Sequence, residues 1–138
     1  MRGRPGLALA ASRDRAGRLV GDAVGMADQT VLVVDDQEVV RNVITTTLER
    51  AGYRVLAAAS PNAALELVRG EGPIDLLVTD VVMPEMDAFE LAGRATARLP
   101  SLRVLYTSGY TDAAAEGPFI KKPFTPAQLL EKVRAVLT

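Results

Sequence analysis

The chain of 138 residues contains no cysteine, no histidine and no tryptophan, and only 4% of its residues are aromatic. Without cysteine there is no disulfide and no thiolate metal site, and the lack of histidine removes imidazole bases, ligands and phosphohistidine. Few aromatic residues argue against a base-stacking platform for nucleic acid. No apolar run reaches the ~18 residues that a membrane span needs. We therefore expect a cytoplasmic protein with no membrane contact and no direct nucleic-acid binding.

The length and composition fit one globular domain, with 49% hydrophobic and 24% charged residues and a net charge of −1. Residues 1–29 differ from the rest, because they are rich in Gly, Ala and Arg and hold five arginines against three aspartates. We predict a disordered N-terminal extension over 1–29 and a single domain over 30–138. Two alternatives are that Met26 is the natural start and that the extension is a functional basic arm.

The stretch from Leu76 to Pro84 is the most informative part of the chain. Residues Leu76 to Thr79 form a short apolar run with β-branched members, which is typical of a strand buried on both faces of a parallel sheet. Because an isolated buried carboxylate is very costly, Asp80 must emerge where this strand ends. Open α/β sheets place their ligand crevice at the carboxyl ends of the strands. The sequence therefore predicts an acid at the rim of a sheet.

Apolar segments with strand and helix periods alternate along the rest of the domain. We expect strands over 30–34, 53–58, 76–79, 102–107 and 119–121. Helical spacing or capping signals mark 39–51, Ser60-Pro61 onward, 89–99, and Thr125-Pro126 onward with a capping-box Gln128. This alternation predicts an α/β fold with a doubly wound, five-stranded parallel sheet and right-handed crossovers. The flavodoxin-like strand order 2-1-3-4-5 suits it.

Polar residues follow four of these strands: Asp35 and Asp36, Asp80, Ser108, and Lys122. In the predicted strand order, the acid pair lies beside Asp80, while Ser108 and Lys122 arrive from the other side. Three crowded carboxylates repel one another unless a cation joins them, and oxygen ligands alone select Mg²⁺ or Mn²⁺. Asp80 is then a credible nucleophile toward a phosphoryl group whose oxygens Lys122 and Ser108 contact.

Each of these residues taken alone has a plainer explanation. Asp35 and Asp36 precede a helix and could cap it, and Asp80 could stabilise a turn. Lys122 could be a solvated surface charge beside Lys121. Ser108-Gly109 is a turn signal, and Phe119 is most simply a core residue. Their joint order along the chain is what favours a common site.

That order resembles the response-regulator receiver domains of two-component signalling. The resemblance runs from about Thr30 to the end and is carried by 33–36, 79–87, 107–109 and 121–124. It implies that Asp80 is the phosphoacceptor and that Ser108 and Lys122 hold the phosphoryl oxygens. It implies a Mg²⁺ site made by Asp35, Asp36, Asp80 and the backbone carbonyl of Val82, and a switch made by Ser108 and Phe119. The Lys122–Pro123 bond is often cis in this family.

The chain departs from the family pattern in two places. Ala88 stands where the family usually has Gly, so the preceding loop is expected to differ slightly if that position needs a positive φ. Only 13 residues separate Ser108 from Lys122, and the approach to the last strand uses several of them. At 3.6 residues per turn, 110–117 allow at most about two helical turns. We therefore expect the fourth helix to be short or absent and the usual dimer face to be altered.

The leading interpretation is a CheY-like, stand-alone phosphoacceptor module that is not a turnover enzyme. It would receive a phosphoryl group from a sensor histidine kinase or a histidine phosphotransfer protein and change its contacts with an unknown downstream protein. Because nothing follows Thr138, we expect no output domain on this chain. One alternative is a receiver-like protein-binding module that acts without phosphorylation. Another is a phosphohydrolase with an aspartyl nucleophile, which Val82 disfavours because it is not an acid or base.

Overall fold

A five-stranded parallel sheet forms the centre of the domain, in the order β4-β3-β5-β6-β7. The computed structural model describes residues 12–13, 19–20, 29–109 and 117–138. The strands of the sheet are β3 Thr30–Val34, β4 Arg54–Ala58, β5 Leu76–Asp80, β6 Arg103–Ser108 and β7 Phe119–Lys121. The helices are α2 Glu38–Arg50, α3 Pro61–Gly70, α4 Ala88–Arg98 and α5 Pro126–Leu137. In chain order this sheet is 2-1-3-4-5, as predicted.

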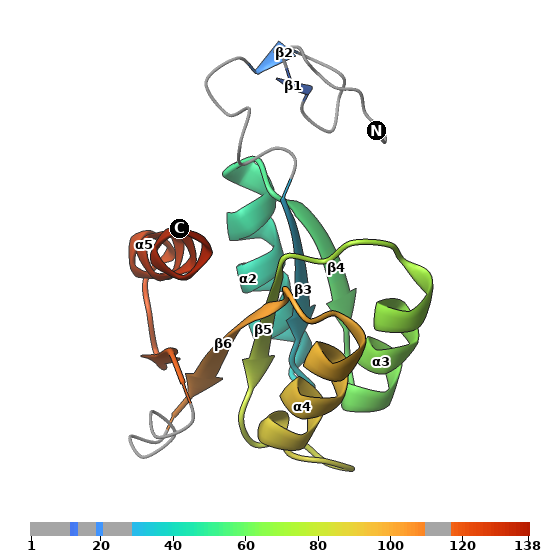
Figure 1. Ribbon diagram of the computed structural model, residues 1–138. Helices are drawn as coiled ribbons and strands as arrows, with labels where there is room; N and C mark the ends of the chain where they lie inside the picture. The colour runs from blue at the N-terminus through green and yellow to red at the C-terminus, as the bar shows by residue number, and fades with distance from the viewer. Residues whose placement is uncertain (1–11, 14–18, 21–28, 110–116) are drawn as a thin grey trace.

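Helices cover the two faces of the sheet and define two cores (Figure 1). On one face, α2 and α5 pack on the strands through Ile44, Leu48, Leu129 and Val133. On the other face, α3 and α4 contribute apolar residues that include Ala64, Val68, Leu91 and Ala95. Strands β3 and β5 lie between both layers, and every residue in them is buried. This accounts for their nearly continuous apolar sequence, since neither face of a central parallel strand meets water.

Side-chain caps fix where three of the helices begin. The Ser60 hydroxyl accepts from the backbone N–H of Ala63 at the start of α3, directly before Pro61. The Asp87 carboxylate accepts from the Glu90 N–H at the start of α4. At α5, Thr125 and Gln128 form the predicted capping box. These caps satisfy backbone donors that the first helical turn leaves without partners.

Asp75 links three strands at the end of the sheet where the strands start. Its carboxylate accepts from the Thr30 N–H at 2.7 Å, and its own N–H donates to the Thr30 carbonyl at 2.8 Å. Its carbonyl accepts from the Arg103 N–H at 3.1 Å. One residue at the entry to β5 therefore holds the first residues of β3 and β6.

The predicted elements are confirmed with shifts of one or two residues at most ends. The sequence pattern was less accurate on α2, where Val39 and Val43 share the helical spacing of the buried Ile44 and Leu48 but are 76% and 48% exposed. A short apolar side chain at such spacing can lie beside the buried stripe instead of in it.

Two other expectations fall largely on residues outside the described ranges. The shortened fourth helix was expected in 110–117, of which only Gly117 is described. Most of the N-terminal extension is also outside them, apart from β1 Ser12–Arg13 and β2 Leu19–Val20, which pair antiparallel. The domain division at 29/30 stays a prediction. Within the described residues, no helix combines the length and apolar character needed to cross a membrane.

Candidate functional site

The site lies at the carboxyl ends of the strands. Asp80 is the last residue of β5, and Asp35 directly follows β3. Because Val34 pairs with Thr79 in register, the next residue on each strand places Asp35 beside Asp80. Ser108 ends β6, and Lys122 directly follows β7. The strand order thus brings together residues that are up to 87 positions apart in the sequence.

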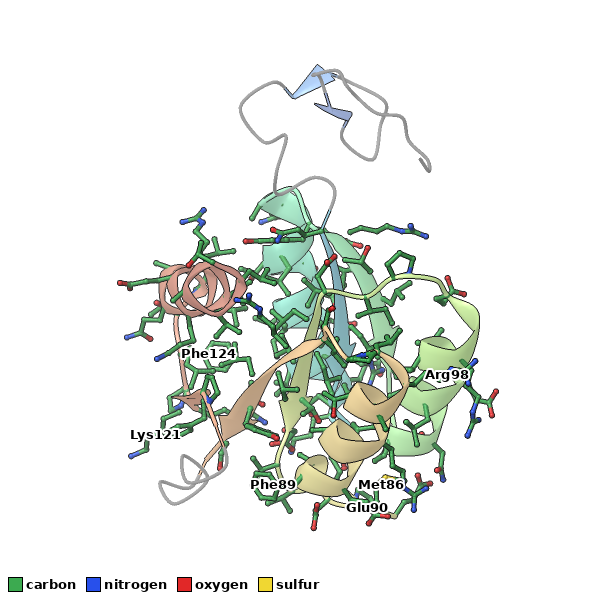
Figure 2. The ribbon with its side chains drawn as sticks, in the orientation of Figure 1. Met86, Phe89, Glu90, Arg98, Lys121 and Phe124 are labelled. Carbon is green, nitrogen blue, oxygen red and sulfur yellow. The ribbon has the colours of Figure 1, made fainter. Side chains whose placement is uncertain are left out.

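Lys122 joins two of the three acids. Its Nζ lies 3.2 Å from Oδ2 of Asp35 and 3.2 Å from Oδ1 of Asp80. The side chains are only 20%, 1% and 12% exposed for Lys122, Asp35 and Asp80. An ion pair with so little solvent is weakly screened, so these contacts strongly constrain the three side chains. The neighbouring Lys121 is exposed, and its side chain points outward at the edge of the sheet (Figure 2).

Asp35 is held by the start of helix α2 as well as by Lys122. Its Oδ1 accepts from the Gln37 N–H at 2.9 Å, and its backbone carbonyl accepts from Nη1 of Arg41 at 2.8 Å. Its own N–H donates to the carbonyl of Ala58 in β4 at 3.3 Å. Asp35 therefore has a fixed orientation that combines contacts from the helix, a neighbouring strand and the lysine.

Three carboxylates could hold a metal ion at this rim. One oxygen from each of Asp35, Asp36 and Asp80 lies within 4.8 Å of the other two. Asp35 and Asp80 are buried, whereas Asp36 is exposed and borders solvent. Hard carboxylate oxygens that face partly into water fit Mg²⁺, which keeps several waters when it binds to protein. The donor set is therefore consistent with Mg²⁺ and also with Mn²⁺.

The electrostatics of the site set Asp80 apart. Burial raises the pKa of the Asp80 carboxyl above its ordinary value, Lys122 lowers it, and the nearby Asp35 carboxylate raises it again. The net direction is upward, so the unfavourable effects of burial and of the like charge outweigh the attraction to Lys122. A positive charge arriving at this rim would therefore favour the ionised form of Asp80.

Ser108 and Phe119 lie next to this cluster on β6 and β7. Ser108 is 1% exposed, and its carbonyl accepts from the Lys122 N–H at 2.7 Å. Phe119 is half-buried against the α3/α4 core, and it pairs in register with Tyr106 of β6. The predicted switch residues are thus on adjacent strands, and the carbonyl of Ser108 is hydrogen-bonded to the backbone N–H of Lys122.

In the loop after Asp80, the positive backbone φ lies at a residue that the sequence did not indicate. Ala88 opens α4 and is fully buried, whereas Glu85 has φ 80°. The side-chain carboxylate of Glu85 accepts from Nδ2 of Asn62 at 3.1 Å. Val82, in the same loop, is 60% exposed, so its side chain faces solvent. The Lys122–Pro123 bond is cis, in keeping with the family resemblance.

All of the predicted acids and Lys122 come together, but sequence reasoning missed the residues that orient Asp35. Gln37 and Arg41 act through backbone contacts, one as an N–H donor and one toward a carbonyl. The sequence contained one signal for such a contact. Arg41 is a basic residue near the start of the helix that follows Asp35 and Asp36.

Comparisons with known proteins agree with this geometry. A sequence model of the response regulator receiver domain matches residues 31–134. The response regulator receiver protein CpdR of Brucella abortus (strain 2308) is 34% identical over 115 residues, which cover 78% of this chain and 95% of CpdR. The sensor kinase CckA of the same organism is 37% identical over 117 residues, but these span only 12% of that kinase.

Solved structures show the same similarity. The receiver domain of the hybrid histidine kinase CckA superposes with a TM-score of 0.71 at 35% identity, over 79% of this chain and 99% of that one. The chemotaxis protein CheY4 of Vibrio cholerae gives a TM-score of 0.73 at 28% identity, over 79% and 98% of the two chains. The matched family, the parallel sheet and the acidic rim agree, and the chain belongs to the response regulator receiver domains of two-component signalling.

Proposed function

We propose that this domain accepts a phosphoryl group on Asp80 from a histidine kinase or a histidine phosphotransfer protein, with Mg²⁺, and thereby changes its contacts with other proteins. The observation that carries the proposal is the position of Lys122, whose Nζ is 3.2 Å from both Asp35 and Asp80. A lysine in this place can neutralise oxygens of a group attached to Asp80 without leaving the rim.

The transfer step uses the Asp80 carboxylate as nucleophile. One of its oxygens forms a bond to phosphorus, and the phosphorus–nitrogen bond to the donor histidine breaks with its electron pair going to the imidazole. Because the partly buried carboxylate has few competing waters, the chain's contribution is mainly positioning and neutralisation of charge. In this proposal, Lys122 and the Ser108 hydroxyl hold the transferred oxygens.

Asp35, Asp36 and Asp80 would hold the metal ion, together with the backbone carbonyl of Val82. When bound, the ion would supply positive charge that reduces the repulsion between the carboxylates and an incoming phosphoryl group. Asp35 suits this role because Gln37 and Arg41 already fix its orientation. Asp36 suits it because its exposed carboxylate can bind the ion from the solvent side.

The switch in this proposal consists of Ser108 and Phe119. A phosphoryl group on Asp80 attracts the Ser108 hydroxyl, and the vacated space lets the half-buried Phe119 ring turn inward. Phe has no hydroxyl, so packing alone would stabilise the inward position. A preference of a few kcal/mol between the two positions would suffice to change a binding surface.

The outer face of α2 is the surface best suited to the donor. Val39, Val43 and the loop residue Val82 are large apolar side chains left exposed near the acidic rim. An apolar helix face bordering a phosphoacceptor matches a donor whose histidine is carried on a helix. CckA, which this chain resembles over its receiver region, is named a sensor kinase, and this makes a kinase of that kind a reasonable donor to test.

The decisive experiment is incubation of the chain with acetyl phosphate and Mg²⁺, followed by intact mass spectrometry. We expect one phosphoryl adduct per chain, no adduct with Asp80→Asn, and loss of the adduct when EDTA is present. Asp87→Asn is the matched control, since it changes an exposed acid and asparagine can still cap α4.

Two results would contradict the proposal. The absence of an adduct in a folded wild-type protein would support a receiver-like binding module that acts without phosphorylation. Sustained release of phosphate without an accumulated adduct would instead make the protein a phosphohydrolase. We propose that it is not a turnover enzyme, so a single stoichiometric adduct is the expected result.

A further inference from the structure

Among the described residues, the sheet face that carries α3 and α4 is incompletely covered at β6. Helix α3 connects β4 to β5, helix α4 connects β5 to β6, and both helices lie on this face. Parallel strands are joined by right-handed crossovers, so the connection from β6 to β7 belongs on the same face. Its described residues, Gly109, Gly117 and Pro118, are not helical. Even a fully helical 110–116 would reach only about 10 Å, roughly half the length of a six-residue strand.

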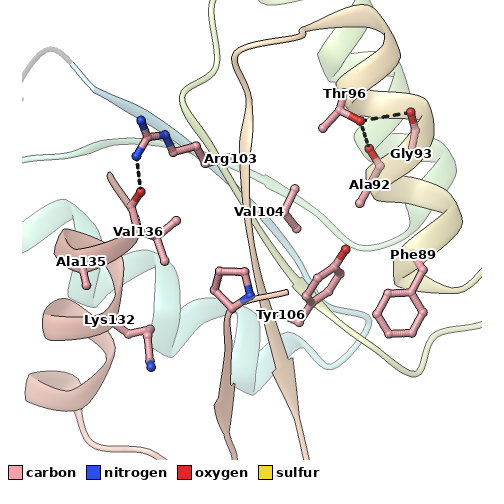
Figure 3. Close-up of a pocket in the computed structure, with 11 residues that line it drawn as sticks. Phe89, Ala92, Gly93, Thr96, Arg103, Val104, Tyr106, Lys132, Ala135 and Val136 are labelled. Carbon is pink, nitrogen blue, oxygen red and sulfur yellow. Dashed lines mark hydrogen bonds between the residues drawn. The ribbon is translucent and has the colours of Figure 1, made fainter. Parts of the chain in front are cut away.

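A groove of about 760 Å³ lies along this part of the sheet, between α4 and α5 (Figure 3). Phe89 and Gly93 of α4 form one wall, Val104 and Tyr106 of β6 form the floor, and Lys132 of α5 lies on the opposite side. The rings of Phe89 and Tyr106 pack at 5.0 Å between centroids with an interplanar angle of 59°. The floor is therefore apolar, and one of its rings packs directly on a ring of the α4 wall.

Strand β6 has an open edge beside this groove. The Tyr106 N–H donates to the Pro118 carbonyl, so the main chain of Tyr106 faces the β7 side. Val104, two residues earlier, points its main chain the same way, because alternate residues of a strand share a direction. β7 starts opposite Tyr106 and runs away from Val104. The N-terminal half of β6 thus has no neighbouring strand among the described residues on this side.

The charged side chains of the groove have one sign. Both are basic, Arg103 and Lys132, although the whole chain has a net charge of −1. Nη1 of Arg103 donates to the uncharged carbonyl of Val136 at 2.7 Å. In the described part of the chain, neither Arg103 nor Lys132 forms an ion pair with a carboxylate. The groove thus offers two cations whose charge the described residues leave uncompensated.

We propose that this groove is the docking site for an amphipathic helix of a partner protein, with apolar residues on one face and acidic residues along its flank. Such a helix would take the place that a crossover helix would fill in this layer, beside α4. Its apolar face would pack on Val104, Tyr106 and Phe89, and its acids would pair with Arg103 and Lys132. This inference rests on the groove and does not require phosphorylation of Asp80.

A second copy of the chain is a poorer occupant. Among the described residues, the only helix with large exposed apolar side chains is α2, which presents Val39 and Val43. Two valines bury little area compared with what a stable interface needs. Arg41 lies between them, and the acid beside them, the exposed Glu38, offers a single partner for the two cations of the groove. The charges therefore favour a partner of different composition.

The test uses two synthetic helical peptides with the same leucine face, roughly 16 residues or about 24 Å of helix each. One peptide carries glutamates along the flank and the other carries lysines. Binding is measured by fluorescence anisotropy, and amide chemical shifts locate it on the chain. We expect the acidic peptide to bind about five to ten times more tightly, as two surface ion pairs allow. The double variant Arg103→Glu with Lys132→Glu should reverse this preference.

Gly93→Leu provides a steric test that does not endanger folding. A Cβ added at Gly93 meets no atom within 4 Å, and Gly93 lies inside helix α4 and lines the groove, so leucine there adds apolar volume at the groove wall. We expect this variant to weaken the acidic peptide about tenfold or more, as loss of a central contact does. Gly70→Leu is the matched control, because its added Cβ is equally free and Gly70 lies at the end of α3, outside the groove.

Three outcomes would overturn the proposal. Equal binding of the acidic and basic peptides would remove the charge argument, and shift changes confined to α2 would place binding on another face. Self-association of the free chain, measured by sedimentation and abolished by Gly93→Leu, would make a second copy the occupant. Binding of the acidic peptide that is lost with Gly93→Leu and kept with Gly70→Leu supports the docking site.

Discussion

The acidic rim and the groove beside β6 both contain charged side chains, but they differ in whether those side chains have partners of opposite charge. At the rim, Lys122 contacts both Asp35 and Asp80, and Asp35 accepts one further hydrogen bond from the Gln37 N–H. In the groove, the charges of Arg103 and Lys132 have no carboxylate partner within the described ranges. At the rim, two of the three carboxylates are therefore already paired with a cation, whereas in the groove neither cation is paired with a described carboxylate. Removing Lys122 from the rim should therefore destabilise the fold, whereas substitutions in the groove should change its stability little.

The largest effect is expected at Lys122. Lys122→Ala leaves the buried carboxylates of Asp35 and Asp80 without their cation, and breaking a buried pair is strongly destabilising. Because the lysine is 20% exposed, we expect a loss of about 2 kcal/mol in the free energy of unfolding, less than for a fully buried pair. Urea unfolding at pH 7 without divalent metal measures it.

Lys121→Ala is the matched control for this experiment. Lys121 precedes Lys122 but is exposed, so its substitution should change the free energy of unfolding by no more than about 0.5 kcal/mol. Equal losses for the two variants would show that the ion pairs of Lys122 at the rim contribute no more to stability than an exposed surface lysine.

A smaller effect of opposite sign is expected for Asp80→Asn. The raised pKa of Asp80 means that folding favours its protonated form, so the ionised form costs stability at neutral pH. In metal-free buffer at pH 7, the variant should therefore be more stable, by about 1 kcal/mol, an ordinary single-site effect. The gain should shrink as the pH falls through the raised pKa of Asp80, because the wild-type carboxyl then also becomes neutral.

Thermal unfolding across this pH range would check that prediction, with Asp87→Asn as the exposed-acid control. A variant that is less stable than wild type at pH 7 would mean that the attraction to Lys122 outweighs burial and the repulsion from Asp35.

The smallest effect is expected in the groove. Gly93 lies inside α4 with open space around its Cα, so Gly93→Ala should stabilise the helix by about 0.5–1 kcal/mol. Gly70→Ala, at the last residue of α3, should gain less because helix ends fray. A destabilised Gly93→Ala, measured by the same urea unfolding, would indicate that the groove wall is already tightly filled.

The rim could be predicted from the sequence because its residues obey a local rule. A run of buried residues such as Leu76 to Thr79 cannot continue through a charge, so Asp80 marks the end of its strand. Once the alternation of strands and helices sets the order of the sheet, the positions of Asp35, Ser108 and Lys122 follow from the ends of their own strands. The capping residues Ser60 and Thr125 were predictable for the same local reason.

The rest depends on tertiary contacts that no short pattern records. Val39 and Val43 match the helical spacing of buried residues but are exposed, because burial on α2 depends on where α5 and the loops lie. The positive φ at Glu85, in the loop after β5, accompanies a contact with Asn62 of helix α3. The groove depends on which part of β6 stays uncovered. The sequence indicates only that the connection from β6 to β7 is short.

Asp75 gives the sheet a fixed base opposite the acidic rim. Because it ties the first residues of β3 and β6 to the entry of β5, these strands cannot slide past one another at that end. With that end fixed, a pull on Ser108 would displace the rim end of β6 more than its start, and β7 would move with it because Ser108 pairs with Lys121. Tyr106, two residues before Ser108, is the place where such a displacement would first alter the floor of the groove.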